Sequence, residues 1–177
     1  GYTIEFELVD FFVTYGKRTL SNEFLRRSFY AGTTFYQEIE DPKQDFEKNR
    51  IKAYLGSPKH FFKNLIEKKW GKNEFLLFDG SFATDANLHF EISDAHNMKL
   101  VKVNRKEIKI NSLNKTEFFR SFNMLYDNKN QSIITLKTSE FYVDAYGNNT
   151  HIDKIDFSGE ISKKRFGDML PLNFLPK

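Results

Sequence analysis

Cysteine is absent from this chain of 177 residues, which excludes disulfides, thiolate nucleophiles and cysteine-ligated zinc or iron–sulfur sites. Long apolar runs are absent too, since none approaches the ~18 residues that a membrane-spanning helix needs. No signal peptide is recognisable, because Gly1 and Tyr2 lead directly into a strand pattern. We therefore expect a folded domain without a transmembrane helix.

Histidine is scarce, and His60, His89, His96 and His151 show neither the H-x-x-x-H nor the H-E-x-x-H spacing of a helical metal site. His89 and Glu91 would share one face of a strand, where a surface pair is expected rather than a metal site. The G-x-S-x-G elbow is missing, and the nine glycines are too scattered for a phosphate-binding loop or a dinucleotide fingerprint. We predict no catalytic residue, no cofactor and no metal, and the chain is not expected to be an enzyme.

Aromatic residues are abundant, with twenty Phe and eight Tyr, and they suit the pleated surface of antiparallel sheets. The length fits a single β-rich domain over 1–177. The predicted fold class is α+β, mainly antiparallel β, as a β-sandwich or strongly curled sheet with one amphipathic helix packed on it. An incomplete barrel around that helix is the alternative.

The strand predictions begin with 2–13, where Ile4, Phe6 and Leu8 alternate with polar residues, and with 28–39, where Gly32 marks a bulge or bend. Turn residues at 127–130 predict a hairpin over 117–137, and Gly147 with its following asparagines predicts another over 140–158. The remaining short strands are expected at 74–79, 87–93, 98–103, 106–111, 117–126, 131–137, 140–146 and 151–158.

Two helices are predicted, a loose one over 43–55 and a clear one over about 57–70. In the second, Ser57 is a good N-cap, Pro58 occupies the first helical position and Gly71 is the expected C′ residue. One face of this helix is apolar and should be buried, and it carries Phe61, Phe62, Leu65, Ile66 and Trp70.

The net charge of +3 is too small to imply a polyanionic partner, but the basic residues cluster. Segment 43–72 holds nine basic and three acidic residues. Its helix makes Lys59, Lys63, Lys68 and Lys69 candidates for binding an anion or a lipid headgroup. The simpler interpretation is the solvated side of a core-facing helix, and nucleic acid is an unlikely partner because the aromatics fall on the opposite side.

Two stretches resemble a known family. Residues 49–62, NRIKAYLGSPKHFF, resemble the signature NR-x-x-AY-x-GS-x-(R/K)HF, and the ending resembles G-…-R-x-(A/G)D-x-LP-x-(D/N)Y. The family is the Bacteroidetes carboxypeptidase-like regulatory domain-containing cell-envelope proteins, in the region C-terminal to their transthyretin-like regulatory domain. Pro58 and Phe174 depart from the pattern. The matching positions are Asn49, Arg50, Tyr54, Gly56, Ser57, His60, Phe61, Gly159, Arg165, Asp168, Leu170 and Pro171.

The resemblance implies an exported protein of the periplasm or outer membrane, with this chain as the C-terminal part of a longer precursor. It implies a non-catalytic cell-envelope module that binds a protein or glycan partner, without peptidase activity. Only structural roles follow for the matching residues: Ser57 caps a helix, His60 reaches back to the cap, and Arg165 pairs with Asp168. Two alternatives stay open, a hydrolase whose site forms only in three dimensions and an anion-binding surface on the basic helix.

The C-terminal tail is too apolar for a free end. We expect a helical turn over 162–169 that Pro171 stops, and a tail that packs back on the sheet. Leu170 and Phe174 would then enter the core.

Overall fold

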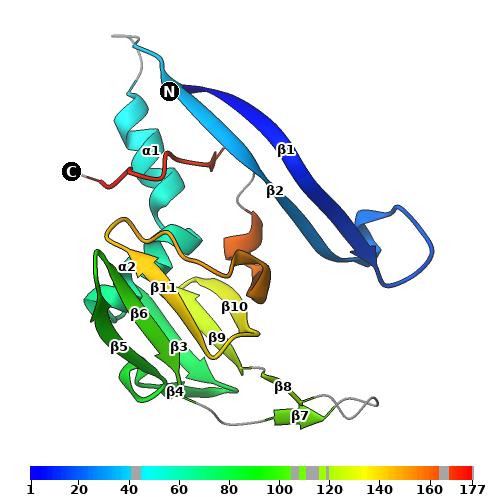
Figure 1. Cartoon of the computed structure of the whole chain (residues 1–177), viewed down its shortest axis with the longest axis vertical. Helices are drawn as coiled ribbons and strands as arrows, with labels where there is room; N and C mark the ends of the chain where they lie inside the picture. The colour runs from blue at the N-terminus through cyan, green and yellow to red at the C-terminus, as the bar shows by residue number, and fades with distance from the viewer. Residues whose placement is uncertain (41–44, 105–107, 111–115, 119, 164–167, 177) are drawn as a thin grey trace. The chain divides into compact units, whose positions relative to one another are not determined.

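A computed structural model describes residues 1–40, 45–104, 108–110, 116–118, 120–163 and 168–176 (Figure 1). The chain divides into two compact units, Gly1–Glu47 and Lys48–Lys177, where the sequence predicts one domain over 1–177. Every buried core residue of the described chain lies in the second unit. The first unit therefore depends on cross-strand pairing rather than on a core of its own.

The first unit is a long antiparallel hairpin of β1 (Tyr2–Tyr15) and β2 (Leu25–Glu38), with a short 3-10 turn, η1 (Asn22–Phe24), before the second strand. Leu8 pairs with Gly32 and Asp10 pairs with Ala31, so Val9 is the extra residue of a β-bulge. This confirms the irregularity predicted at Gly32 and places the extra residue on the opposite strand.

The helices are α1 (Phe46–Tyr54) and α2 (Pro58–Glu67). The predicted start of α2 is confirmed, since Ser57 has extended backbone and its Oγ accepts the His60 N–H at 3.2 Å. The predicted end is wrong. Lys68 itself takes the left-handed conformation, with φ of 56°, and its N–H bonds back to the helix, so α2 ends before Gly71 is reached.

The second unit contains a five-stranded antiparallel sheet in the order β12-β10-β9-β3-β4. The turn after Tyr126 joins β9 to β10, which confirms the hairpin predicted there. The strands are β3 (Phe75–Asp79), β4 (Phe82–Thr84), β9 (Arg120–Tyr126), β10 (Asn130–Leu136) and β12 (Ile155–Gly159).

A three-stranded antiparallel sheet has the order β11-β6-β5, and β7 (Ile108–Ile110) pairs separately with β8 (Thr116–Phe118). The strands of the three-stranded sheet are β5 (Phe90–Ala95), β6 (Met98–Val103) and β11 (Glu140–Asp144). The remaining 3-10 turns are η2 (Ala86–Leu88), η3 (Ile152–Lys154) and η4 (Glu160–Lys163).

The chain reversal predicted at Gly147 is present, with an antiparallel bridge between Val143 and Asn149, but the predicted extent of the hairpin over 140–158 is wrong, because β12 pairs with β10 rather than with β11. The Asp144 carboxylate explains the different path. Its Oδ1 accepts the backbone N–H groups of Tyr146 at 2.8 Å and Asn148 at 2.9 Å, and so closes a tight turn. Gly147 in that turn lies against the backbone of α2 at Lys59. Beyond the turn the chain runs back along the end of β11 only briefly, with Val143 bridged to Asn149 and the Thr150 N–H donating to Tyr142 O at 2.9 Å.

One cluster of buried residues joins α2 to the inner faces of both larger sheets. Phe61, Phe62 and Leu65 are at most 1% exposed, which confirms the predicted core face of α2. Ile66 and Trp70 are only partly buried at its margin. The fold is mainly antiparallel β with two α-helices and fits the α+β class, while the sandwich or curled sheet stays a prediction. Among the described residues, no helix has the length and apolar character needed to cross a membrane.

Candidate functional site

His60, in the first turn of α2, is held by both ring nitrogens, one bound by the link between α1 and α2 and the other by Glu74 just before β3. Nδ1 accepts the Gly56 N–H at 3.1 Å, and Nε2 lies 3.2 Å from Glu74 Oε2. Because a backbone N–H can only donate, Nδ1 carries no proton and Nε2–H donates to Glu74. Asn64 Nδ2 donates to the same carboxylate oxygen at 2.7 Å. His60 therefore reaches back past the cap, as the sequence predicts, but to Gly56 rather than to Ser57.

Aromatic rings surround the His60 imidazole, with centroids of Tyr54, Phe75 and Tyr126 at 5.0, 5.2 and 5.5 Å. Burial lowers the pKa of His60, Glu74 opposes that effect, and Lys69 adds to it. Burial also raises the pKa of Tyr54 to about 12. Both groups are thus neutral near pH 7. The cluster therefore serves to hold the link between α1 and α2 in place.

Gly56, in the link between α1 and α2, adopts a left-handed backbone conformation, with φ of 69°. A Cβ at this position would lie 2.9 Å from the Tyr126 ring, so a side chain would meet both strain and a clash. The structure brings Tyr54, Gly56, Ser57, His60 and Phe61 together, whereas Asn49 is exposed on α1 and Arg50 is half-buried there.

The lysines of the candidate anion site are largely engaged by groups of the protein itself. Lys63 Nζ donates to Ala145 O at 2.7 Å, and Glu67 binds Lys63 and Lys69 through its two oxygens, each at 2.7 Å. Burial acts to raise the pKa of Glu67, but the two lysines outweigh it and lower that pKa. Lys68 is exposed at the end of α2. This pattern fits the solvated side of a core-facing helix better than an anion site.

Lys59 holds the C-terminal tail. Its Nζ donates to Pro171 O at 2.8 Å and to Leu172 O at 2.7 Å, and Asn148 Nδ2 donates to Leu172 O at 2.8 Å. Burial lowers the pKa of Lys59 to about 8, with Asp144 opposing the shift. The two stretches that carry the family resemblance therefore meet in space, which the spacing along the sequence does not reveal.

The tail folds back onto α2 and the Asp144 turn, and the Phe174 ring lies 6.1 Å from that of Tyr54. The prediction that Leu170 and Phe174 enter the core is wrong, since both are only half-buried. Backbone carbonyls rather than apolar side chains make the main attachment. Asp168 is exposed, and Arg165 lies outside the described residues, as does half of the helical turn predicted over 162–169.

Gly159 ends β12 with φ of 83°, and a Cβ there would lie 2.6 Å from Gln131 O on β10. This family-matching glycine is thus explained by backbone conformation and by close approach of two strands.

A buried polar cluster links β9 to the β4–β5 connection. Arg120 Nη2 donates to Asp79 Oδ2 at 2.9 Å and lies 3.3 Å from His89 Nδ1. His89 Nε2 lies 2.8 Å from Thr84 Oγ1. Because a guanidinium only donates, His89 Nδ1 accepts and Nε2–H faces the hydroxyl. His89 cannot take a proton from Thr84 in this arrangement. The predicted surface pair of His89 with Glu91 is wrong, because His89 is buried.

Within the part of the chain that the structure describes, no three His, Asp or Glu side chains gather where they could hold a metal ion. The two buried histidines each present a protonated nitrogen to an acceptor. Neither arrangement provides a nucleophile and a base.

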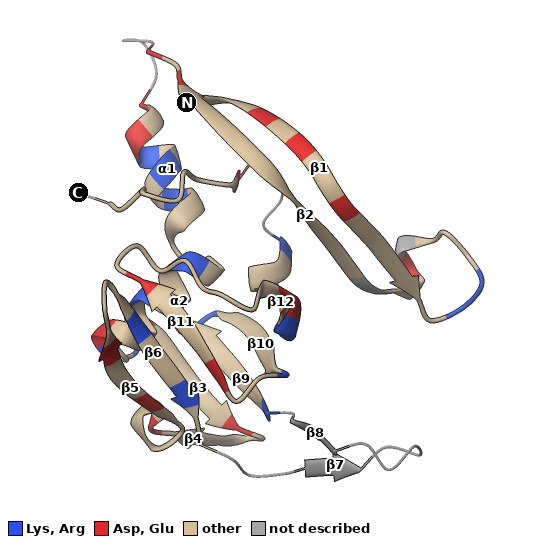
Figure 2. Cartoon of the chain, in the orientation of Figure 1, with Lys and Arg blue, Asp and Glu red and all other residues tan. Residues whose placement is uncertain are grey.

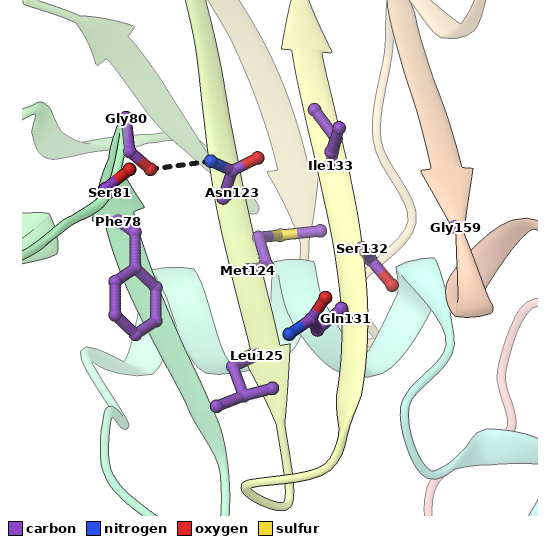
Figure 3. Close-up of a pocket in the computed structure, with 10 residues that line it drawn as sticks. All are labelled: Phe78, Gly80, Ser81, Asn123, Met124, Leu125, Gln131, Ser132, Ile133 and Gly159. Atoms are coloured by element: carbon purple, nitrogen blue, oxygen red, sulfur yellow. Dashed lines mark hydrogen bonds between the residues drawn. The ribbon is translucent and has the colours of Figure 1, made fainter.

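The outer face of the five-stranded sheet carries a groove of about 500 Å³ (Figure 3). The register explains it: Ile133, Asn123 and Phe78 lie side by side on β10, β9 and β3, with their side chains on the face away from the core. Every lining residue is uncharged, and the set comprises Phe78, Gly80, Ser81, Asn123, Met124, Leu125, Gln131, Ser132, Ile133 and Gly159.

Amide groups give the groove its polarity. Asn123 Nδ2 donates to Gly80 O at 2.6 Å, and Figure 3 shows its amide oxygen on the side away from Gly80. Gln131 is exposed, and Ile133 is 40% exposed between these amides. Sequence reasoning missed this groove, since its lining is divided among several strands and the turn after β3, and no strand contributes more than three residues. The alternation of polar and apolar residues from Ser121 to Met124 was the available signal.

Comparison of the chain with protein-family models, curated proteins and solved structures finds no match. The resemblance to the carboxypeptidase-like regulatory domain-containing family therefore stays an expectation from the quoted motifs.

Proposed function

We propose that this chain is a non-catalytic binding module that takes a neutral glycan in the groove on the outer face of its five-stranded sheet. The observation that carries the proposal is the lining of that groove, which combines an aromatic ring and aliphatic side chains with amides and a hydroxyl and contains no charge. Binding sites of about 300–1,000 Å³ with this mixture are typical of small-ligand recognition.

The chemistry of the groove matches a sugar. A sugar ring offers an apolar C–H face and several hydroxyls, which need both donors and acceptors. Phe78 supplies the apolar surface, while Asn123 and Gln131 supply amide groups. A charged ligand would lose its hydration without a countercharge in this lining. A protein segment is the second occupant that the sequence analysis left open, and the exposed amides favour the glycan over it.

The other functions receive less support. A hydrolase would need a base aligned with a nucleophile, and the tautomers of His60 and His89 oppose that role. An anion-binding helix would need available ammonium groups, but Lys59, Lys63 and Lys69 bind acceptors of the protein itself.

The test is calorimetric titration with a panel of neutral oligosaccharides, followed by variants. Phe78→Ala and Asn123→Ala should each weaken binding about tenfold, as expected for a central contact. Phe82→Ala is the matched control, because Phe82 lies on neighbouring β4, is 82% exposed and does not line the groove. Equal losses in all three variants, or binding of peptides but of no sugar, would refute the proposal.

The cellular role belongs to the same proposal. We place the module in the cell envelope, at the periplasm or outer membrane, on the basis of the motifs over 49–62 and 159–174. Fractionation of cells that express the protein naturally tests this, and recovery in the cytosolic fraction would contradict it.

A further inference from the structure

The hairpin of the first unit has one long face of mainly aromatic and aliphatic side chains, here called the aromatic face, with Glu38 opposite Tyr2 at its open end. The register of β1 and β2, which run side by side in Figure 1, puts these side chains on one side of the two strands. Tyr2 contacts Tyr36 edge-on at 5.7 Å, and Phe6 contacts Tyr30 at 6.4 Å. From the bulge onward the face continues with Phe11, which pairs with Tyr30. Its aromatic and aliphatic members are Tyr2, Ile4, Phe6, Leu8, Phe11, Val13, Tyr15, Tyr30 and Tyr36, and Ser28, Thr34 and Glu38 lie among them on β2.

This aromatic face is open to solvent where it is widest. Leu8 is 54% exposed, Phe11 is 58% exposed and Tyr30 is 42% exposed. Two-stranded hairpins are marginally stable in water, and contiguous apolar patches of this kind mark interaction surfaces. A partner that covers the aromatic face would supply the burial that the hairpin lacks.

The other face of the hairpin is different. It carries Glu5, Glu7 and Asp10, all exposed, and Figure 2 shows these acids spaced along β1. Its aromatic residues are Phe35, opposite Glu5, and the pair Phe12 and Phe29, which stack on each other at 5.1 Å. Two copies that met through this face would bring like charges together, which disfavours association. The charge pattern therefore selects the aromatic face for a partner of the same sequence.

Charge also differs between the two ends of the hairpin. The tip carries Lys17 and Arg18, whereas the open end carries Glu38 and Glu40. In an antiparallel pair of hairpins, the basic tip of each copy lies over the acidic open end of the other. A two-fold axis through the centre of the face produces this arrangement twice.

We infer that the aromatic face is the interface of a homodimer, in which a second copy of this chain packs face to face and antiparallel on the first. Strands of 14 residues give a face about 45 Å long and roughly 10 Å wide. Two copies would bury about 900 Å², just below the standard range of specific interfaces. The dimer is accordingly weak and dependent on concentration.

Sedimentation velocity on the full 177-residue chain, over roughly 1–200 µM, should show a reversible monomer–dimer equilibrium. Phe11→Asp places a charge in the face and should raise the dissociation constant at least about tenfold. Phe35→Asp is the matched control, since Phe35 is 63% exposed on the acidic face and lies in the same hairpin. A monomer at every concentration would overturn the inference, as would a larger effect of the control.

Charge exchange tests the antiparallel orientation through restoration of the dimer, which the loss of the contact between Lys17 and the Phe24 ring cannot mimic. Lys17→Glu with Arg18→Glu should weaken the dimer, and adding Glu38→Lys with Glu40→Lys should restore it within about threefold. Failure of the second pair to restore association would overturn the arrangement. Unchanged near-ultraviolet circular dichroism of the full chain, to which the paired aromatic rings of the hairpin contribute, would show that each variant remains folded.

Discussion

Gly56 sits between the two helices, where the backbone must turn and the Tyr126 ring lies close. Gly56→Ala should lower the free energy of unfolding by about 2–4 kcal/mol, because alanine is strained in the left-handed conformation and its Cβ would clash with the Tyr126 ring. Gly80→Ala is the control, since Gly80 has φ of 64° but open space around its Cα. Gly80→Ala should lower the free energy of unfolding, measured by urea denaturation, by only about 1–2 kcal/mol. Equal losses would show that the ring contact contributes nothing.

His60 makes stability depend on pH. Its pKa is lower in the folded chain than in the unfolded chain, where it is about 6.5. Below that pH the unfolded chain binds a proton that the folded chain does not, so the free energy of unfolding falls as the pH falls. His60→Asn keeps an acceptor near the position of Nδ1 and should show a shallower loss between pH 7.5 and 5.5.

His96→Asn is the control for that experiment, because His96 is exposed on a positive-φ position that asparagine tolerates. It should retain the pH dependence of the parent chain in chemical denaturation. Glu74 and Lys69 are the charged groups that influence His60, and neither is altered in these variants. Parallel curves for the His60 variant and the parent would contradict the assignment.

At the scale of elements, α2 owes its position to burial rather than to its lysines. Leu65 is 1% exposed within the cluster of α2 and both larger sheets. Leu65→Ala should therefore cost about 2–5 kcal/mol in thermal or urea unfolding. Leu88→Ala, at a residue 67% exposed, should change stability by less than about 0.5 kcal/mol. A mild effect of Leu65→Ala would mean that α2 is peripheral.

Lys59 fastens the tail through two charge-assisted hydrogen bonds to backbone carbonyls. Lys59→Met should release residues 168–176, with faster amide exchange there and a loss of about 1–3 kcal/mol. Lys68→Met removes an exposed charge from the end of the same helix and should leave tail exchange unchanged. Protection of the tail in the Lys59 variant would contradict this attachment.

The sequence correctly predicted the elements that are determined by residues close together in the chain, such as helix caps and tight turns. Ser57 and Pro58 marked the start of α2, and the turn after Tyr126 marked the β9–β10 hairpin. The partners of β11 and β12 could not be predicted, since both pair with strands distant in sequence. The end of α2 was misplaced because Lys68, rather than a glycine, adopts the left-handed conformation.

The candidate site was less accessible to sequence reasoning than the fold was. The residues singled out by motif, such as Gly56 and His60, hold backbone in place. The groove instead needs the outward side chains of β3, β9 and β10 to line up across the sheet. That alignment depends on strand register, which alternation along a single strand does not specify.

At the scale of the whole molecule, the two units differ in composition and in role. Residues 1–47 hold nine acidic and five basic residues, whereas the basic cluster over 43–72 falls mostly in the second unit. The second unit contains the core and the groove on the five-stranded sheet, and the first contains the aromatic face. The proposed glycan recognition and the proposed self-association therefore fall on separate units.

An amide NMR titration of the full chain with neutral oligosaccharides reports directly on the proposed glycan site. Chemical shift changes should concentrate on the side-chain amides of Asn123 and Gln131 and on the backbone around Ile133, with saturation at a single affinity. Shifts confined to the lysines of α2, or no shift with any neutral sugar while an acidic ligand binds, would contradict the proposed site.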